Sequence, residues 1–390
     1  MSNIIEYAET ALSPMTETPF THVDSLVLSQ FAYIHIDGLV PGLADGKAAV
    51  RFGDLLRAEH FSTMFTDILA PENNKQLLYA LCASPRFRDV TLNWYTDTHD
   101  AQRLEQFGAM TFLLPDGTAY LAYRGTDTTF LGWKEDFNMA YVCPVPSQAS
   151  GLAYLEQIAA LCDRPLRLGG HSKGGNVAVY AAMKCSDAVR SRILHIYSHD
   201  GPGFNHAVID GTEFSAIEAR IDKTLPQSST VGMLLQSHEP YKVVKSNQLG
   251  GLLQHDPFSW VIEDNAFVTL DKITGSAAYM NTTLDKWLEQ LPNEKRAVLI
   301  GAMFEILDAS GAKTFADFSE HWQTDIPAML KALSRQDAET REEVLDIFKA
   351  LAVISFKGLL PELPAIPAKA VRNAHGKQSA AHASAKKAKG

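Results

Sequence analysis

The segment from residue 168 to residue 175 constrains the fold more than any other part of the chain. It reads LGGHSKGG, follows a short apolar run typical of a strand, and precedes a helix-forming run at residues 176–184. A serine in the pattern G-x-S-x-G between a strand and a helix occupies a sharp turn, and the flanking glycines let the helix approach the strand closely. The segment therefore predicts a strand–turn–helix unit that directs the hydroxyl of Ser172 outward.

This turn makes Ser172 a candidate nucleophile. It also places the backbone N–H of Lys173 at the start of a helix, where the N–H can stabilise an oxyanion. A phosphate-binding loop is disfavoured, because Lys173 is followed by Gly174 rather than by Ser or Thr. We expect the side chain of Lys173 to face solvent and only its amide to matter.

A second glycine-containing turn lies upstream, at residues 123–127 (YRGTD). It ends a strand-like run, and a turn at this place is where folds with such a serine turn hold the other oxyanion donor. We expect the backbone N–H of Thr126, together with its hydroxyl, to fill that role. The alternative is a plain exit from the strand, with Arg124 in a structural ion pair.

The order of the elements predicts the fold class. Residues 109–114 and 118–124 flank Pro115-Asp116-Gly117, which is a strong hairpin signal. A helix at residues 152–161, strands at 165–168, 192–198 and 241–244, and the helix after Ser172 then alternate. Such alternation indicates an α/β fold with a mainly parallel central sheet covered by helices. Apolar residues at helical spacing in residues 280–360 predict a C-terminal helical region.

Three parts of the chain are expected. Residues 1–262 form an α/β-hydrolase core, and residues 263–362 form a mostly helical C-terminal region that is a cap or a subdomain. Residues 363–390 are polar and of low complexity, follow a proline-rich segment, and predict a disordered basic tail.

The charge balance narrows the function classes. Lys and Arg number 35 against 45 Asp and Glu, which gives a formal net charge of −10. Six positive charges and no acid lie in residues 368–390, so the rest of the chain carries −16, six more negative than the whole. A body this acidic argues against nucleic-acid binding, because phosphate recognition needs basic surface. We expect the basic tail to be solubilising.

Cysteine usage and hydropathy indicate the compartment. Cys82, Cys143, Cys162 and Cys185 are far apart, with no C-x-x-C and no metal-type spacing, which predicts reduced thiols. The N-terminus lacks the basic and apolar regions of a secretory signal, and no apolar run reaches the roughly 18 residues that span a bilayer. We expect a cytoplasmic protein without a transmembrane segment, which leaves room for peripheral contact with a membrane.

A nucleophilic serine needs a base and an orienting acid, in the chain order Ser, acid, His. His255 follows a late strand on a glycine-containing loop and is the expected base. Asp200 stands at the end of the strand after the serine turn, and active-site residues gather at that edge of an open sheet. Asp200 is the expected acid, a turn aspartate before Gly-Pro is the alternative, and Asp210 and Asp222 are held in reserve.

These motifs together resemble a known group of proteins. Residues 123–126 (YRGT), 133–136 (WKED) and 170–175 (GHSKGG) resemble class 3 lipases, which are α/β-hydrolases. The chain is more similar still to a bacterial domain-of-unknown-function family of lipase-like proteins. That similarity extends the match to residues 19–33, 200–204, 226–235 and 254–260, and covers roughly residues 19–262.

The resemblance implies a serine acyl hydrolase with Ser172 as nucleophile, His255 as base, and Thr126 and Lys173 at the oxyanion positions. The chain departs from the class 3 pattern at the acid. Those lipases carry an aspartate on the segment that residues 226–235 (PQSSTVGMLL) replace, and Ser228 and Ser229 stand there. Asp200 lies one strand earlier, where some lipases place the acid.

Three functions fit the sequence. The first is hydrolysis of a small-molecule or lipid ester, such as a lysophospholipid, through an acyl-enzyme on Ser172. The second is a hydrolase-fold scaffold that binds a ligand or partner, which the missing class 3 aspartate favours. The third is acyl transfer to an acceptor other than water by the same residues. Because this chemistry needs only side chains and amides, we expect no organic cofactor, and the histidine spacing predicts no metal.

Overall fold

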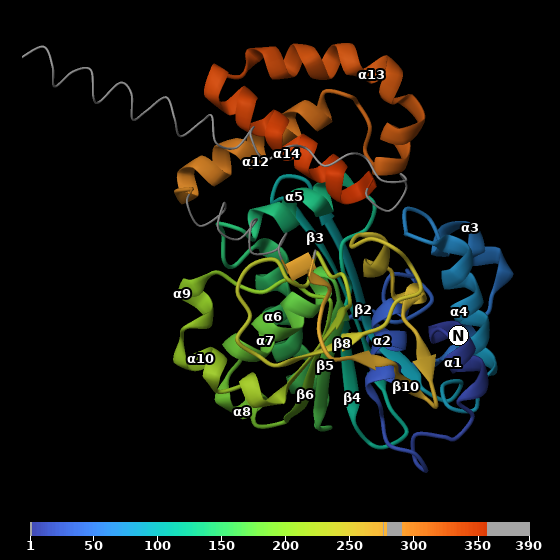
Figure 1. Ribbon diagram of the computed structural model, residues 1–390. Coiled ribbons are helices and arrows are strands. Elements are labelled where there is room, and N and C mark those ends of the chain that lie inside the picture. The colour runs from blue at the N-terminus through green and yellow to red at the C-terminus, as the bar shows by residue number, and fades with distance from the viewer. Residues whose placement is uncertain (1, 276, 279–290, 357–390) are drawn as a thin grey trace, which may run out of the picture.

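A computed structural model describes residues 2–275, 277–278 and 291–356 of the chain. Its centre is a nine-stranded sheet in the order β1-β2-β3-β4-β5-β6-β7-β8-β11, beside a two-stranded sheet of β9 and β10 (Figure 1). The strands are β1 (Val50–Arg51), β2 (Thr91–Asp100), β3 (Glu105–Leu113), β4 (Ala119–Tyr123), β5 (Leu166–His171), β6 (Ile193–His199), β7 (Ile221–Pro226), β8 (Tyr241–Val244), β9 (Ile262–Glu263), β10 (Ala266–Phe267) and β11 (Thr269–Leu270).

The strands from β4 to β8 pair in parallel, while β1 to β4 form antiparallel pairs at one edge and β11 closes the other edge antiparallel. The expected hairpin is β3–β4, with Ala109 opposite Tyr123. The expected strand at residues 241–244 is β8. A mainly parallel sheet with a serine turn after β5 confirms the predicted α/β-hydrolase fold.

Helices cover both faces of the sheet (Figure 1). Along β4, Tyr120 and Ala122 join a core with α1, α2 and α4, while Leu121 and Tyr123 join a second core with α6 and α7, as the strand period of two requires. The described helices are α1 (Ile4–Thr10), α2 (His22–Phe31), α3 (Phe61–Met64), α4 (Pro71–Ala83), α5 (Phe130–Asn138), α6 (Pro146–Leu161), α7 (Lys173–Lys184), α8 (Asp187–Arg190), α9 (His206–Ile209), α10 (Thr212–Ser215), α12 (Asn293–Asp308), α13 (Phe315–Arg335) and α14 (Ala338–Phe356).

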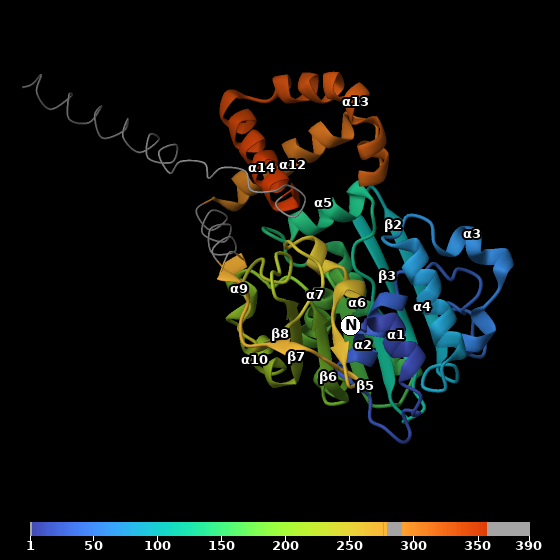
Figure 2. The ribbon, with the colours of Figure 1, turned by 45° about the vertical axis from the view of Figure 1, so that its right-hand side comes forward.

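The C-terminal helices α12, α13 and α14 lie together above α5, at one end of the sheet (Figures 1 and 2). A third apolar core joins them to α5, with Phe130 of α5 buried against residues such as Met303 and Phe304 of α12. Backbone groups at both ends of α5 are also held: Phe130 N–H donates to the Lys313 carbonyl (2.9 Å), and Arg296 donates to the carbonyl of Ala140, just after the helix (2.8 Å). The C-terminal region is therefore mainly helical between residues 293 and 356, as the sequence predicts.

The division of the chain into 1–262 and 263–362 stays a prediction. Strand β11, at residues 269–270, already lies past the first boundary and still belongs to the central sheet. The predicted tail at residues 363–390 falls outside the described residues. Within the part of the chain that is described, no helix is long and apolar enough to cross a membrane.

Candidate active site

Ser172 lies on a sharp turn between the last residue of β5 and the first of α7. Its backbone has φ +58° and ψ −134°, a conformation that L-residues rarely adopt, and its N–H donates to the His199 carbonyl at 2.9 Å. The neighbours of Ser172 explain the need for glycine. A Cβ on Gly174 would lie 2.0 Å from the Tyr123 carbonyl oxygen, and one on Gly170 would lie 2.3 Å from the carbonyl carbon of Gly174. The strained turn is thus the one the sequence predicts.

Asp200 follows β6 and is completely buried, also at a positive φ of +51°. Its Oδ2 lies 2.6 Å from Nδ1 of His255. A carboxylate here fixes the tautomer, because Nδ1–H donates to Asp200 and Nε2 is left to act as a base. The structure therefore brings together the two residues that the sequence predicts as base and acid.

Oδ1 of Asp200 accepts hydrogen bonds from residues 226–235, the segment that differs from the class 3 lipase pattern. Ser229 Oγ donates to Asp200 Oδ1 at 2.6 Å, and Gly232 N–H donates to the same oxygen at 3.1 Å. In the sequence, Ser228 and Ser229 are visible only as a departure from the class 3 lipase pattern. Their position shows that the replaced segment supports a carboxylate from the preceding strand.

His255 lies in a short 3-10 turn that is braced from two sides, whereas the sequence suggested a glycine-flexible loop. Gln254 accepts from the Ser228 N–H (2.8 Å), and the Gln254 carbonyl accepts from the Trp260 indole (2.9 Å). The His255 carbonyl accepts from Nε2 of His171 at 2.8 Å, and the two rings lie 4.4 Å apart. His255 is thus fixed beside the residue that immediately precedes Ser172.

His171 itself is neutral in this arrangement. Because its Nε2 donates to a carbonyl, its Nδ1 accepts from the Tyr33 hydroxyl at 3.0 Å. Burial lowers the pKa of His171 well below its usual range, and the nearby His255 adds to the shift. Neither His171 nor Tyr33 was among the predicted site residues, although the histidine is visible inside the serine motif.

The expected oxyanion donors are the amides of Thr126 and Lys173. Neither N–H hydrogen bonds to another residue in the described part of the chain, so both are available to a ligand. The Thr126 hydroxyl, in contrast, donates to Oδ2 of Asp136 in α5 at 2.5 Å. Burial raises the pKa of Asp136 to about 6, against the opposing influence of the Lys173 ammonium and the Thr126 hydrogen bond.

The side chain of Lys173 does not face solvent as the sequence suggested. It is only 1% exposed, and its ammonium lies 2.8 Å from Oε2 of the buried Glu135. Its hydrogen bonds go to Gln106 of β3 and Glu135 of α5, so carbonyl and carboxylate oxygens replace water around the ammonium. The prediction was wrong because these acceptors are remote in sequence.

The turn at residues 123–127 is also a charged structural element, as the alternative interpretation proposed. Arg124 is buried, and its two terminal guanidinium nitrogens each donate a hydrogen bond to the Asp97 carboxylate. Burial alone would raise the pKa of Asp97, but the His35 hydrogen bond and the Arg124 charge hold it well below its usual range. Asp127 pairs with Nε2 of His99 at 2.8 Å. The two ion pairs fix the strand exit on either side of Thr126.

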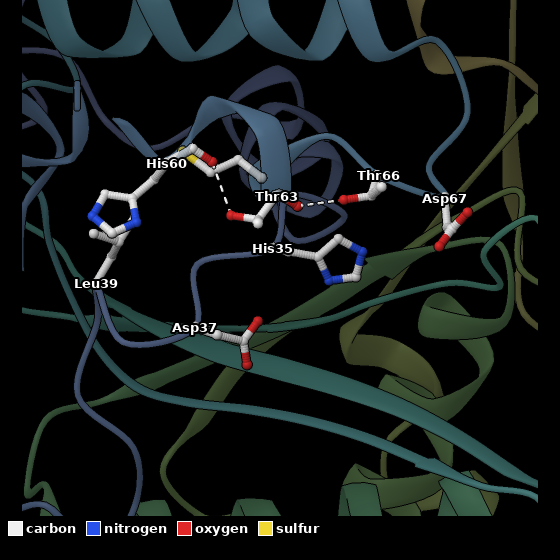
Figure 3. Close-up of a pocket in the computed structure, with 8 residues that line it drawn as sticks. His35, Asp37, Leu39, His60, Thr63, Thr66 and Asp67 are labelled. Atoms are coloured by element: carbon white, nitrogen blue, oxygen red, sulfur yellow. Dashed lines mark hydrogen bonds between the residues drawn. The ribbon is translucent and has the colours of Figure 1, made fainter. Parts of the chain in front are cut away.

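A polar hollow of about 250 Å³ lies beside this network, with His35, Asp37, His60 and Asp67 around it (Figure 3). Atoms of His35, Asp37 and Asp97 lie within 4.8 Å of one another, close enough to share a metal ion. The oxygens of Asp97, however, already accept from Arg124, His35 and Tyr95. We therefore assign no metal to this group, and neither Ser172 nor His255 lines the hollow.

The remaining candidates lie elsewhere. Asp222 pairs with His22 (3.0 Å) and with the half-exposed His195 (2.9 Å), away from His255. His195 is therefore a surface residue, although it lies within strand β6. Asp210 is exposed and lies near His206 and His238.

Comparisons with known proteins found several lipases among the similar solved structures. Similar solved structures include a fungal lipase–inhibitor complex (14% identity, TM-score 0.36, 57% of this chain and 78% of that one). Another is M37 lipase (15% identity, TM-score 0.35, 55% of this chain and 70% of that one). A third is the lipase of Rhizopus microsporus var. chinensis (17% identity, TM-score 0.32, 52% of this chain and 72% of that one). Because these similarities are weak, the fold assignment rests on the sheet order and the serine turn. No curated protein matches the chain. The Mbeg1-like family model matches residues 81–305, more than half of the chain, which therefore belongs to the Mbeg1-like family.

Proposed function

We propose that this chain is a serine hydrolase that cleaves carboxylic esters through an acyl-enzyme. The observation that carries the proposal is the strained Ser172 turn beside a buried Asp200 carboxylate that hydrogen bonds to His255. A serine on a strained strand-to-helix turn and a histidine whose tautomer is fixed by a carboxylate are two features of an activated hydroxyl.

In the proposed reaction, Ser172 Oγ attacks the ester carbonyl carbon while its proton passes to Nε2 of His255. Asp200 accepts the hydrogen bond from Nδ1–H and stabilises the imidazolium. The tetrahedral oxyanion receives hydrogen bonds from the amides of Thr126 and Lys173. As the intermediate collapses, the alcohol takes the proton from His255. Water then repeats the sequence and releases the acid and free Ser172.

The surroundings of His255 favour an apolar acyl group. Leu249, Leu252 and Leu253 precede His255 on the same loop, and all three are exposed. Three exposed leucines next to a catalytic histidine offer a surface for an alkyl chain, because apolar contact there removes area from water. This observation supports a lipid or lysophospholipid ester over a short polar one.

The proposal is tested by labelling with a fluorophosphonate and by hydrolysis of p-nitrophenyl esters from acetate to palmitate. Labelling requires an activated serine, so we expect it in the wild-type protein and not in Ser172→Ala. Turnover should fall at least about 10³-fold in that variant. Ser29→Ala is the matched control, because Ser29 is buried in α2 and hydrogen bonds to Tyr120. Folded wild-type protein that neither labels nor hydrolyses any ester would contradict the proposal and favour a scaffold.

A further inference from the structure

A buried lysine beside the candidate nucleophile has no part in the proton transfers described above. The ammonium of Lys173 donates to Glu135 Oε2 at 2.8 Å, to the Gln106 carbonyl at 2.9 Å and to Gln106 Oε1 at 3.1 Å. An ammonium has three protons, so these three acceptors satisfy it completely.

Glu135 is equally enclosed and extends the cluster. Its Oε2 also accepts from the Gln106 N–H at 3.1 Å, and its Oε1 accepts from the Ser147 N–H at 2.7 Å. Lys173 opens α7, Gln106 lies in β3, Glu135 lies in α5, and Ser147 lies at the start of α6. One buried ion pair therefore connects four elements.

The same turn of α5 also holds the other expected oxyanion donor. Asp136, next to Glu135, accepts the Thr126 hydroxyl, and Lys173 Nζ lies 3.8 Å from Asp136 Oδ1. Glu135 thus holds Lys173, which supplies one expected oxyanion amide, and Asp136 holds Thr126, which supplies the other. Removing the ammonium would release α5 from the serine turn and leave two carboxylates, Glu135 and Asp136, without their shared cation.

We propose that Lys173 is a positioning residue, whose buried ammonium fixes α5 to the serine turn and thereby sets the spacing of the Thr126 and Lys173 amides. The inference rests on the proposed function for its catalytic consequence, but its structural consequence is independent of it. A buried ion pair is weak evidence for a gain in stability, since its desolvation cost offsets the attraction between the charges. Its contribution here is the fixed geometry of the groups it connects.

The chain contains a matched control. Lys223 is also 1% exposed and pairs with a buried glutamate, Glu239, at 3.1 Å. It lies in β7, and its hydrogen-bond and ion-pair partners in the described structure, Ser237 and Glu239, lie outside α5. Lys173→Met and Lys223→Met therefore remove the same charge from similar surroundings, and only the first removes it from the elements that carry the expected oxyanion donors.

The first measurement is hydrogen–deuterium exchange, which needs no activity. We expect Lys173→Met to increase exchange in peptides from residues 124–138 by about tenfold or more, and Lys223→Met to leave these peptides unchanged. Glu135→Gln, which keeps the shape of the side chain, should give a smaller increase in the same peptides and serves if Lys173→Met does not fold. Unchanged exchange in residues 124–138 for the folded variants would overturn the proposal, whether or not the protein is an esterase.

The second measurement is the rate of fluorophosphonate labelling and of ester turnover. We expect Lys173→Met to lower kcat by about 100-fold with little change in KM, as for the loss of one oxyanion donor. The double variant Lys173→Met/Glu135→Gln removes the unpaired charge, and it should recover thermal stability but not kcat. Recovery of kcat in the double variant would overturn the positioning role, because the ion pair would then serve only to balance charge. An inactive wild type with the expected exchange pattern would reject the esterase and retain the structural link.

Discussion

The candidate site has two sides that are built differently: the side proposed for proton transfer, with Asp200 and His255, and the side proposed to bind the oxyanion, with Thr126 and Lys173. On the proton-transfer side, His255 and Asp200 lie on short connections after strands, and their hydrogen bonds come from nearby loops, such as Ser229 and Gly232. On the oxyanion side, Thr126 and Lys173 depend on α5. That helix is held on one side by the ion pair of its own Glu135 with Lys173, and on the other by packing against the C-terminal helices.

The difference lies in how far each side depends on the rest of the molecule. Asp200 and His255 are held by residues close to them, so we expect a change elsewhere to leave their 2.6 Å contact intact. The oxyanion side reaches α12 through the aromatic face of α5, where the rings of Phe137 and Phe304 lie 5.8 Å apart. We expect catalytic defects on the first side to be large and local. Defects on the second should be smaller and should extend to distant residues.

The largest effect tests the proton-transfer side. Asp200→Asn keeps the shape of the acid but favours the wrong tautomer of His255, so we expect kcat for a p-nitrophenyl ester to fall about 10⁴-fold. Asp222→Asn is the control, because Asp222 pairs with His22 and His195 and not with His255. Full activity of Asp200→Asn would mean that the acid is another residue, and equal losses in both variants would remove the local character of this side.

A smaller loss is expected on the oxyanion side from Thr126→Val. The substitution keeps the amide but removes the hydroxyl that Asp136 holds, so the amide is less well placed. We expect kcat to fall by about 10- to 100-fold while KM is little changed. Steady-state kinetics of Thr128→Val supply the control, since the Thr128 hydroxyl donates instead to the exposed Asp67 carbonyl. A Thr126 variant with wild-type kcat would show that the hydroxyl has no part in positioning.

The same contrast explains what the sequence could predict. The turn at Ser172 has a local signal, because the glycines that permit it are its neighbours in the chain. Asp200 and His255 follow from the strand order, since parallel strands bring their carboxyl ends to one edge. The sequence also predicts the roles of base and acid for them, and these catalytic roles remain predictions.

The burial of Lys173 could not be predicted in this way. Its acceptors, Glu135 and Gln106, lie 38 and 67 residues earlier, and no local pattern connects them to the serine turn. One signal was present. Glu135 lies in a helix with the aromatic residues Phe130, Trp133 and Phe137, and an acid in an apolar helix needs a cation or several donors. The packing of α12 against α5 could not be predicted either, because the helical spacing of apolar residues predicts that α12 is a helix but not which element it packs against.

A moderate effect tests how far the oxyanion side extends. Phe304 in α12 is buried against α5, and Phe304→Ala should cost about 3–5 kcal/mol of packing free energy. We expect kcat to fall several-fold and amide exchange in α5 to rise. Phe87→Ala is the control, because Phe87 is just as buried but belongs to a different apolar core, where its ring lies against Tyr7 of α1. Its chemical denaturation midpoint should fall without a change in kcat. If both variants lost kcat equally, the coupling through α5 would be refuted.

The smallest effect concerns the dependence of stability on pH. Asp136 has a pKa of about 6 in the folded chain against an ordinary value of 3.8, so the folded state binds its proton more tightly. Its contribution to the free energy of unfolding is greatest below pH 3.8 and is lost as the pH rises through 6. Urea denaturation between pH 4 and pH 7 should therefore show that Asp136→Asn removes a decline in stability with rising pH.

Asp222→Asn should have the opposite sign. Burial alone would raise the pKa of Asp222, but hydrogen bonds from His22 and His195 lower it, so its contribution is present at higher pH and is lost as the pH falls through the lowered pKa. Subtracting each variant's curve from that of the wild type gives the contribution of each carboxyl together with its hydrogen-bonding partners, and the Asp222 curves are extended below pH 3.8, where its lowered pKa lies. Slopes of the same sign would mean that the carboxyl beside Thr126 is not desolvated. The oxyanion side would then lack the enclosed setting that distinguishes it from the proton-transfer side.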